Sequence, residues 1–162
     1  MTENDIRLLL VDDEKDLVTY LGKRFAREGF KVSSFTSGAE AIEAARTQAF
    51  DMAVVDLKMP EIDGVEVQRQ LKILQPFLQV VVLTGHGGFD SALESGRNQA
   101  HSYLQKPYEF SGLLEILYAA YDVKRKAQRE QFQKELKESV GNGASSPAIL
   151  TVINELRKKY EQ

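Results

Sequence analysis

Short apolar runs alternate with helix-length segments along most of this chain. Five runs predict β-strands: 6–11, 31–35, 52–57, 79–84 and 101–106. The first, third and fourth runs are almost continuously apolar, which is typical of parallel strands that helices cover on both faces. The runs at 31–35 and 101–106 are more polar, so we place these two strands nearer the edges of the sheet.

The segments between the runs carry the 3.6-residue apolar periodicity of amphipathic helices. In 14–29, for example, Leu21 and Phe25 share one face and Gly29 provides a stop signal. Helices are expected over 14–29, 39–48, 64–75, 89–98 and 108–122. The pattern is weakest in 89–98, which is either a short frayed surface helix or a segment kept marginal because it must rearrange.

Five alternations of strand and helix predict a doubly wound α/β domain with a parallel sheet, spanning residues 1–122. Helical propensity continues through 123–140 with almost no apolar stripe. Residues 141–147, GNGASSP, indicate a linker, and 148–162 repeat apolar residues at helical spacing. This last helix is too short to be stable alone, so we expect it to pack on another part of the protein.

The amino-acid composition excludes several classes of function. The 162 residues are 43% hydrophobic and 28% charged, as in an ordinary globular domain. The chain contains no cysteine, which removes disulfides and thiolate catalysis, and its two histidines, His86 and His101, are too few for a histidine-rich metal site. No signal peptide or membrane-length apolar run is apparent, so a cytoplasmic protein without a membrane partner is expected.

Charge is unevenly distributed along the chain. Residues 1–122 carry 12 basic and 19 acidic side chains, whereas residues 123–162 carry 9 and 5. Because acidic residues are interspersed among the basic ones, the tail gives only a weak signal for nucleic-acid binding. We therefore do not expect this chain alone to bind nucleic acid.

Polar and charged side chains gather at the carboxyl ends of the predicted strands. Asp12 and Asp13 follow the first strand, Asp56 ends the third, Thr84 the fourth and Lys106 the fifth. Singly, each has an ordinary explanation as a helix cap, a turn residue or a surface residue. Together they lie at the rim where doubly wound sheets bind ligands. Three crowded carboxylates repel one another unless a cation intervenes, so the rim is expected to bind Mg²⁺ and, beside the lysine and threonine, a phosphoryl group.

Four sequence motifs that include these residues resemble the motifs of a known family. LLLVDDE, VVDLKMPEIDG, VVLTGHG and SYLQKPYE, in this order and spacing, resemble the receiver domain of bacterial two-component response regulators. The resemblance covers residues 5 to about 122 and implies a flavodoxin-like (βα)5 fold. The LTGHG phrase resembles receivers attached to transcriptional regulators.

The resemblance implies a role for each residue at the rim. Asp56 corresponds to the phosphoacceptor. Asp12 and Asp13 correspond to the acidic pair that holds Mg²⁺, with Asp13 as the direct ligand, and Asp56 and the backbone carbonyl of Lys58 complete the protein's share of the metal site.

Further residues match the phosphoryl-binding and switching positions of the family. Thr84 and Lys106 match the residues that contact the phosphoryl oxygens, and Tyr103 matches the aromatic residue that changes rotamer on activation. The Lys106–Pro107 bond matches a cis peptide of the family. Lys58 and His86 lie where they could tune the lifetime of the phosphoryl group by ordering or excluding water.

The sequence departs from the family pattern at three positions: Gln99 and Ser102 replace a more usual glycine and acid, and Gly96 replaces an apolar helix residue. They fall on the predicted fourth helix and fifth strand, a face that receivers commonly use to signal. The departures therefore affect how the domain is expected to signal to its partners, and not the phosphorylation site.

The resemblance implies a phosphorylation-dependent switch that accepts a phosphoryl group from a sensor histidine kinase or a phosphotransfer protein and does not turn over external substrates. A phosphatase with an aspartyl-phosphate intermediate is disfavoured because Lys58 stands where its second acid is expected. An oxidoreductase is disfavoured because no G-x-G-x-x-G follows the first strand. A receiver locked in one state and serving as an interaction module is the remaining alternative.

The residues beyond 122 do not identify which output function the receiver controls. The chain is either a stand-alone receiver with a helical extension or a segment of a longer transcriptional regulator. A homodimer could form through the 108–140 helix or through the face made by the fourth helix and fifth strand.

Overall fold

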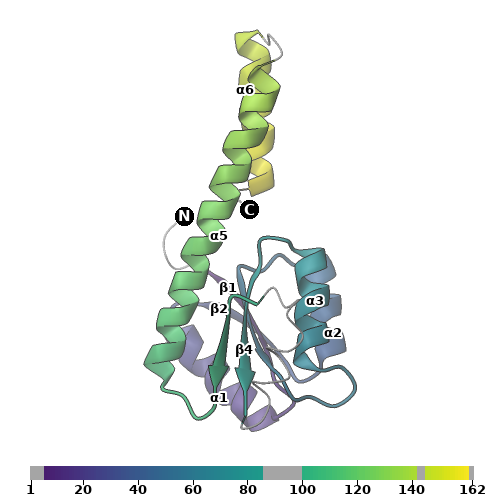
Figure 1. Cartoon of the computed structure of the whole chain (residues 1–162), viewed down its shortest axis with the longest axis vertical. Coiled ribbons are helices and arrows are strands. Elements are labelled where there is room, and N and C mark those ends of the chain that lie inside the picture. The colour runs from purple at the N-terminus through teal and green to yellow at the C-terminus, as the bar shows by residue number, and fades with distance from the viewer. Residues whose placement is uncertain (1–5, 86–99, 142–144, 161–162) are drawn as a thin grey trace. The chain divides into compact units, whose positions relative to one another are not determined.

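The computed structural model describes residues 6–85, 100–141 and 145–160. Its strands form one parallel sheet in the order β2-β1-β3-β4-β5 (Figure 1). They are β1 (Arg7–Val11), β2 (Lys31–Phe35), β3 (Met52–Asp56), β4 (Gln79–Thr84) and β5 (Ser102–Gln105). The predicted doubly wound, flavodoxin-like fold is confirmed, and the two more polar strands, β2 and β5, are indeed the edge strands.

Helices cover both faces of the sheet. The described helices that cover it are α1 (Lys15–Arg27), α2 (Gly38–Thr47), α3 (Gly64–Leu74) and the first turns of α5 (Phe110–Val140). A further helix, α6 (Ser146–Tyr160), follows α5 in the chain. Helix α1 and the first turns of α5 pack on one face, whereas α2 and α3 lie side by side on the other (Figure 1). The helix expected over 89–98 lies outside the described residues.

The alternation of side chains along each strand divides the core into two layers. From β1, Leu8 and Leu10 enter the layer beneath α1 and α5, and Leu9 and Val11 enter the layer beneath α2 and α3. All four are fully buried. The continuous apolar strands of the sequence therefore reflect helices on both sides, and they hold the strand ends rigidly.

Helix α1 ends at the glycine that the sequence marked as a stop signal. Gly29 has φ 94°, which favours glycine because it lacks a Cβ atom. The Gly29 N–H donates to the Ala26 carbonyl and the Phe30 N–H to the Phe25 carbonyl, the pattern of a Schellman motif. The rings of Phe25 and Phe30 then meet edge to face, with centroids 5.7 Å apart. The turn thus leads the chain directly into β2.

The chain divides into two compact units, Met1–Tyr121 and Asp122–Gln162. In the second unit, α6 packs on the later turns of α5, as expected for a helix too short to stand alone. Leu156 is buried, and Glu135 accepts hydrogen bonds from Tyr160 at 2.6 Å and from Lys159 at 3.0 Å.

The start of the last helix was predicted two residues too late. Helix α6 begins at Ser146 rather than at residue 148, so two residues of the expected linker are helical. Pro147 does not prevent this, because N–H groups in the first turn of a helix have no intrahelical acceptor. Among the helices in the described ranges, none has both the length and the apolar character needed to cross a membrane.

Candidate metal and phosphoryl site

The acidic residues lie at the switch point of the sheet, between β1 and β3, where the order of the strands reverses. Strand β1 has β2 on one side and β3 on the other, and crevices at such switch points open beyond the carboxyl ends of the strands. Asp56 is the last residue of β3, and Asp12 and Asp13 directly follow β1. One carboxylate oxygen from each of the three lies within 4.8 Å of the others. Asp12 and Asp56 are buried and Asp13 is exposed.

Backbone contacts fix the position of the acidic pair. The N–H of Asp12 donates to the Phe35 carbonyl of the neighbouring strand at 3.2 Å. The Asp12 Oδ1 atom accepts from the Glu14 N–H at 2.9 Å, just before α1 begins. Asp12 is therefore held from both sides, while its second carboxylate oxygen is buried and lies 3.6 Å from Lys106 Nζ.

Lys106 brings a positive charge to the acidic cluster. Its N–H donates to the Thr84 carbonyl at 2.6 Å, so the end of β5 is tied to the end of β4. Its Nζ atom donates to Asp56 Oδ1 at 2.8 Å and lies 3.6 Å from Asp12 Oδ2. The bond from Lys106 to Pro107 is cis.

Burial and the neighbouring charges shift the pKa values of two groups in the site. Burial raises the pKa of Asp12, as does the neighbouring Asp56, although the Glu14 N–H and Lys106 lower it in part. Burial lowers the pKa of Lys106, but its hydrogen bond to Asp56 and the charges of Asp56 and Asp12 outweigh burial and raise the pKa overall. The site therefore holds more negative charge than its lysine neutralises.

Two buried oxygens in the site indicate a ligand. Asp12 Oδ2 and Thr84 Oγ are both buried and form no hydrogen bond within the described part of the chain. Buried polar atoms in proteins almost always have partners. Three convergent carboxylates suit a hard divalent cation such as Mg²⁺, which prefers oxygen ligands. The donor set therefore fits Mg²⁺, and the Thr84 hydroxyl is available to a further oxyanion.

Tyr103 lies near Thr84 on the neighbouring strand. Its register partner is Val82, two residues before Thr84 on β4, so the two side chains lie on the same face of the sheet. Tyr103 is half-buried, packs against the core layer beneath α2 and α3, and has a buried hydroxyl oxygen. Lys58 is exposed in the loop after β3, and His86 lies outside the described residues.

Tyr108 is a neighbour of the site that the sequence did not single out. Its ring is half-buried and packs against the core layer beneath α1 and α5. Burial raises the pKa of the Tyr108 hydroxyl, Lys106 lowers it, and Asp12 and Asp56 raise it further. Its position two residues after Lys106 was the signal that could have found it.

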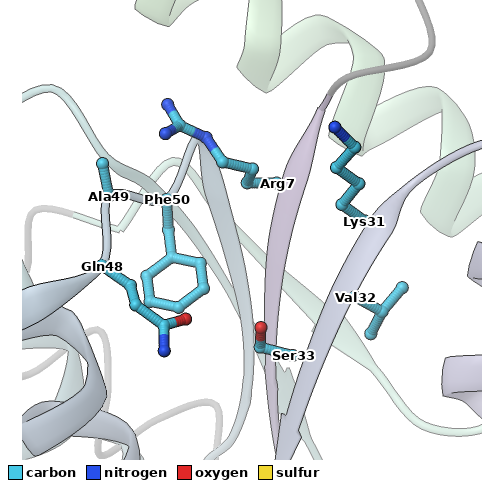
Figure 2. A pocket seen from close by; sticks show the side chains of 7 residues that line it. All are labelled: Arg7, Lys31, Val32, Ser33, Gln48, Ala49 and Phe50. Carbon is cyan, nitrogen blue, oxygen red and sulfur yellow. The ribbon is translucent and has the colours of Figure 1, made fainter. Parts of the chain in front are cut away.

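A separate cavity of about 400 Å³ lies at the amino ends of the strands, away from the acidic cluster (Figure 2). Its lining comprises Arg7, Lys31, Val32, Ser33, Gln48, Ala49 and Phe50. The Arg7 Nε atom lies 3.4 Å from Asp51 Oδ2, which also accepts from the Arg7 N–H at 2.7 Å. Asp51 thus offsets the positive charge of Arg7 at this cavity.

The doubly wound sheet and the acidic cluster at its switch point together define a receiver-type signalling domain. Over residues 8–118 the sequence matches the family described as the response regulator receiver domain. The chain therefore belongs to that family, the receivers of two-component response regulators.

Curated relatives include larger transcriptional regulatory proteins. GlrR of Escherichia coli is 29% identical over 157 residues, which cover 97% of this chain and 34% of GlrR. AlgB of Pseudomonas syringae is 30% identical over 159 residues, covering 97% of this chain and 36% of AlgB. The chain thus spans about a third of the length of these relatives.

Solved structures support the fold. A receiver domain protein of Clostridium thermocellum superimposes with a TM-score of 0.70 at 27% identity, covering 75% of this chain and 98% of that one. The response regulator TrrA of Thermotoga maritima, crystallised in complex with Mg²⁺ and BeF, gives a TM-score of 0.64 at 27% identity, covering 71% of this chain and 98% of TrrA.

Replacing Asp12 with Asn should stabilise the metal-free protein by ~1 kcal/mol at neutral pH, because it removes a buried charge and keeps an acceptor for the Glu14 N–H. Since the pKa of Asp12 is raised on folding, its contribution to stability is favourable below the unfolded pKa and is lost as the pH rises through the folded pKa. The advantage of Asp12→Asn should therefore shrink in acid. Urea unfolding without Mg²⁺ at neutral and acid pH measures both effects.

The exposed Asp16, in the first turn of α1, provides the control. Asp16→Asn should not stabilise the protein, because it removes a favourable charge at a helix N-terminus. A neutral-pH stability of Asp12→Asn equal to or below that of the parent would contradict this view of the crevice.

Proposed function

We propose that this domain is a phosphorylation-dependent switch of a two-component phosphorelay, which accepts a phosphoryl group on Asp56 with Mg²⁺ as cofactor. The contact that carries the proposal is the 2.8 Å hydrogen bond from Lys106 Nζ to Asp56, inside a cluster of three carboxylates. The donor is a sensor histidine kinase or a phosphotransfer protein. The cytoplasmic location expected from the sequence stays a prediction.

Asp12, Asp13, Asp56 and the backbone carbonyl of Lys58 hold the metal ion in this proposal. The convergence of the three carboxylates supports it, as does the relative TrrA, which was crystallised with Mg²⁺ and BeF. When bound, Mg²⁺ supplies positive charge that offsets the charge on the phosphoryl oxygens. Asp13 is the direct ligand open to solvent, and the buried Asp12 is held in place by the Glu14 N–H.

The transfer step requires positioning more than covalent help from the protein. A carboxylate oxygen of Asp56 forms a bond to phosphorus while the P–N bond of the donor phosphohistidine breaks. The electron pair of that bond stays on the imidazole nitrogen, which then takes a proton from solvent. Lys106 moves its hydrogen bond from the carboxylate of Asp56 to an oxygen of the transferred group and stabilises its charge.

The new acyl phosphate biases a two-state equilibrium. The Thr84 hydroxyl, buried without a hydrogen bond among the described residues, donates to a phosphoryl oxygen. Tyr103, which lies on the same face of the sheet, turns inward into the space that Thr84 releases. Contacts made only in the phosphorylated state shift the population toward it.

The domain does not act as a turnover enzyme on external substrates in this proposal. Lys58 occupies the place where aspartyl-phosphate phosphatases are expected to carry a second acid. The alternative, a receiver locked in one state that serves as an interaction module, is less well supported because the carboxylates and the lysine converge at one site.

For the output function, the relatives favour the alternative that this chain is a segment of a longer transcriptional regulator. GlrR and AlgB match this chain through residues beyond the receiver, and both are about three times as long. In this view residues 1–122 form the receiver, the rest of α5 as far as Val140 is a helical extension, and a linker that ends before Ser146 leads to the terminal helix α6. A homodimer through the 108–140 helix, or through the fourth-helix and fifth-strand face, belongs to the same proposal. DNA recognition is assigned to parts outside this chain.

Incubation with acetyl phosphate and Mg²⁺ should add one phosphate to the parent, detected by intact-mass spectrometry. Asp56→Asn should add none, because the amide is not a nucleophile for this step. Asp122→Asn, at an exposed position of α5, is the control and should be modified like the parent. An unmodified parent, or phosphate retained in Asp56→Asn, would overturn the proposal.

The lifetime of the phosphoryl group should depend on Lys58 and His86, which we expect to order or exclude the attacking water. Lys58→Ala and His86→Ala should each change the dephosphorylation rate by up to about tenfold, equivalent to ~1.4 kcal/mol in barrier height. Lys23→Ala, at an exposed position of α1, serves as the control. Rates equal to the parent in both variants would show that neither side chain tunes the lifetime.

A further inference from the structure

The loop between β3 and α3 brings the start of α3 back against the phosphoacceptor. The Gly64 N–H donates to the Leu57 carbonyl at 2.9 Å, which closes the loop, and the Leu57 N–H donates to the Leu83 carbonyl of β4 at 2.8 Å. Glu61, within the loop, has φ 68°, a left-handed conformation that few residues other than glycine adopt. The loop between β3 and α3 is therefore closed by hydrogen bonds and has a fixed conformation.

At Gly64 the helix touches the backbone of Asp56 itself. A Cβ atom built on Gly64 would lie 2.3 Å from the Asp56 carbonyl oxygen and 2.8 Å from the Leu57 Cα atom. Contacts this short do not occur in proteins, and backbone atoms cannot rotate away as a side chain can. A side chain here would move either the start of α3 or the peptide that carries the phosphoacceptor.

We infer that Gly64 is a positioning residue for the phosphoryl-transfer site: the absence of a side chain lets the first turn of α3 rest on the Asp56–Leu57 peptide and fix the acceptor carboxylate. The inference rests on the proposed function and deepens it. The Lys106–Asp56 hydrogen bond and the carboxylate cluster both depend on the position of this peptide. The adjacent Lys58 carbonyl, proposed as a metal ligand, follows in the same loop.

The N-terminal cap of α3 also helps to fix the conformation of the loop between β3 and α3. Asp63 Oδ1 accepts from the Glu66 N–H at 2.9 Å and fixes where the helix begins. Helix α2 has an equivalent cap, in which Ser37 Oγ accepts from the Glu40 N–H at 3.5 Å. The two caps differ in what lies next to them: the first turn of α3 abuts the Asp56 backbone, whereas Gly38 at the start of α2 lies against the Val67 side chain and Ile62.

The first test compares Gly64→Ala with Gly22→Ala in the full chain. In the Gly22 variant the new Cβ would lie 3.1 Å from the Ser34 side-chain oxygen, in the middle of α1 and on the opposite face of the sheet from α3. Phosphorylation by acetyl phosphate at saturating Mg²⁺ should fall roughly 100-fold in Gly64→Ala, as expected for an ångström-scale misplacement of a reacting group. The Mg²⁺ dissociation constant, measured by calorimetry, should rise in the same variant. Gly22→Ala should match the parent in both.

The second test avoids added bulk, so it remains informative if Gly64→Ala fails to fold. Asp63→Ala removes the cap of α3 and should weaken Mg²⁺ binding and slow phosphorylation. Asp63→Asn keeps an acceptor oxygen and should restore both, which separates the cap from the charge. Ser37→Ala removes the cap of α2, whose contact with the Glu40 N–H is longer at 3.5 Å, and should leave both properties unchanged.

The outcomes separate this inference from the proposed function. A parent protein that takes up no phosphate contradicts the proposed function. A phosphorylated parent with a folded Gly64→Ala variant of equal rate and equal Mg²⁺ affinity overturns the positioning role. Equal losses in Asp63→Ala and Ser37→Ala would also overturn it, because general destabilisation would then explain both.

Discussion

The crowding of three carboxylates at the carboxyl ends of β1 and β3 is the constraint on which the site depends. Two of them, Asp12 and Asp56, are buried, and one lysine lies within ion-pair distance of both. Such an arrangement is costly without a bound cation. The fold supports it because the strands behind these residues are buried on both faces, so the carboxylates cannot move apart without disturbing the core.

Much of the fold follows from the sequence because its signals are local. The apolar runs gave the strands, Gly29 marked the end of α1, and the polarity of 31–35 and 101–106 identified the edge strands. The convergence of distant strand ends was also predictable, since parallel strands in a doubly wound sheet place their carboxyl ends along one rim. The particular roles of these residues came from the resemblance to a family.

Other features depend on three-dimensional contacts that no local pattern encodes. Gly64 looks like an ordinary residue at a helix start, and only the distance to the Asp56 carbonyl shows why a side chain is excluded there. Tyr108 lies close enough to the acidic cluster for Asp12 and Asp56 to affect its pKa, because Lys106, two residues earlier, contacts both carboxylates. The start of α6 was misplaced because proline was taken as part of the linker rather than of the first helical turn.

Buried carboxylates, a lysine and a rigid loop are thus organised around one proposed cation site. Calorimetric titration of Mg²⁺ into the parent and into Asp13→Asn tests this most directly, because Asp13 is exposed and its replacement leaves the core intact. We expect one ion per parent chain and at least tenfold weaker binding to Asp13→Asn, a difference of ~1.4 kcal/mol. Absence of binding to the parent, or equal affinity for the two proteins, would contradict it.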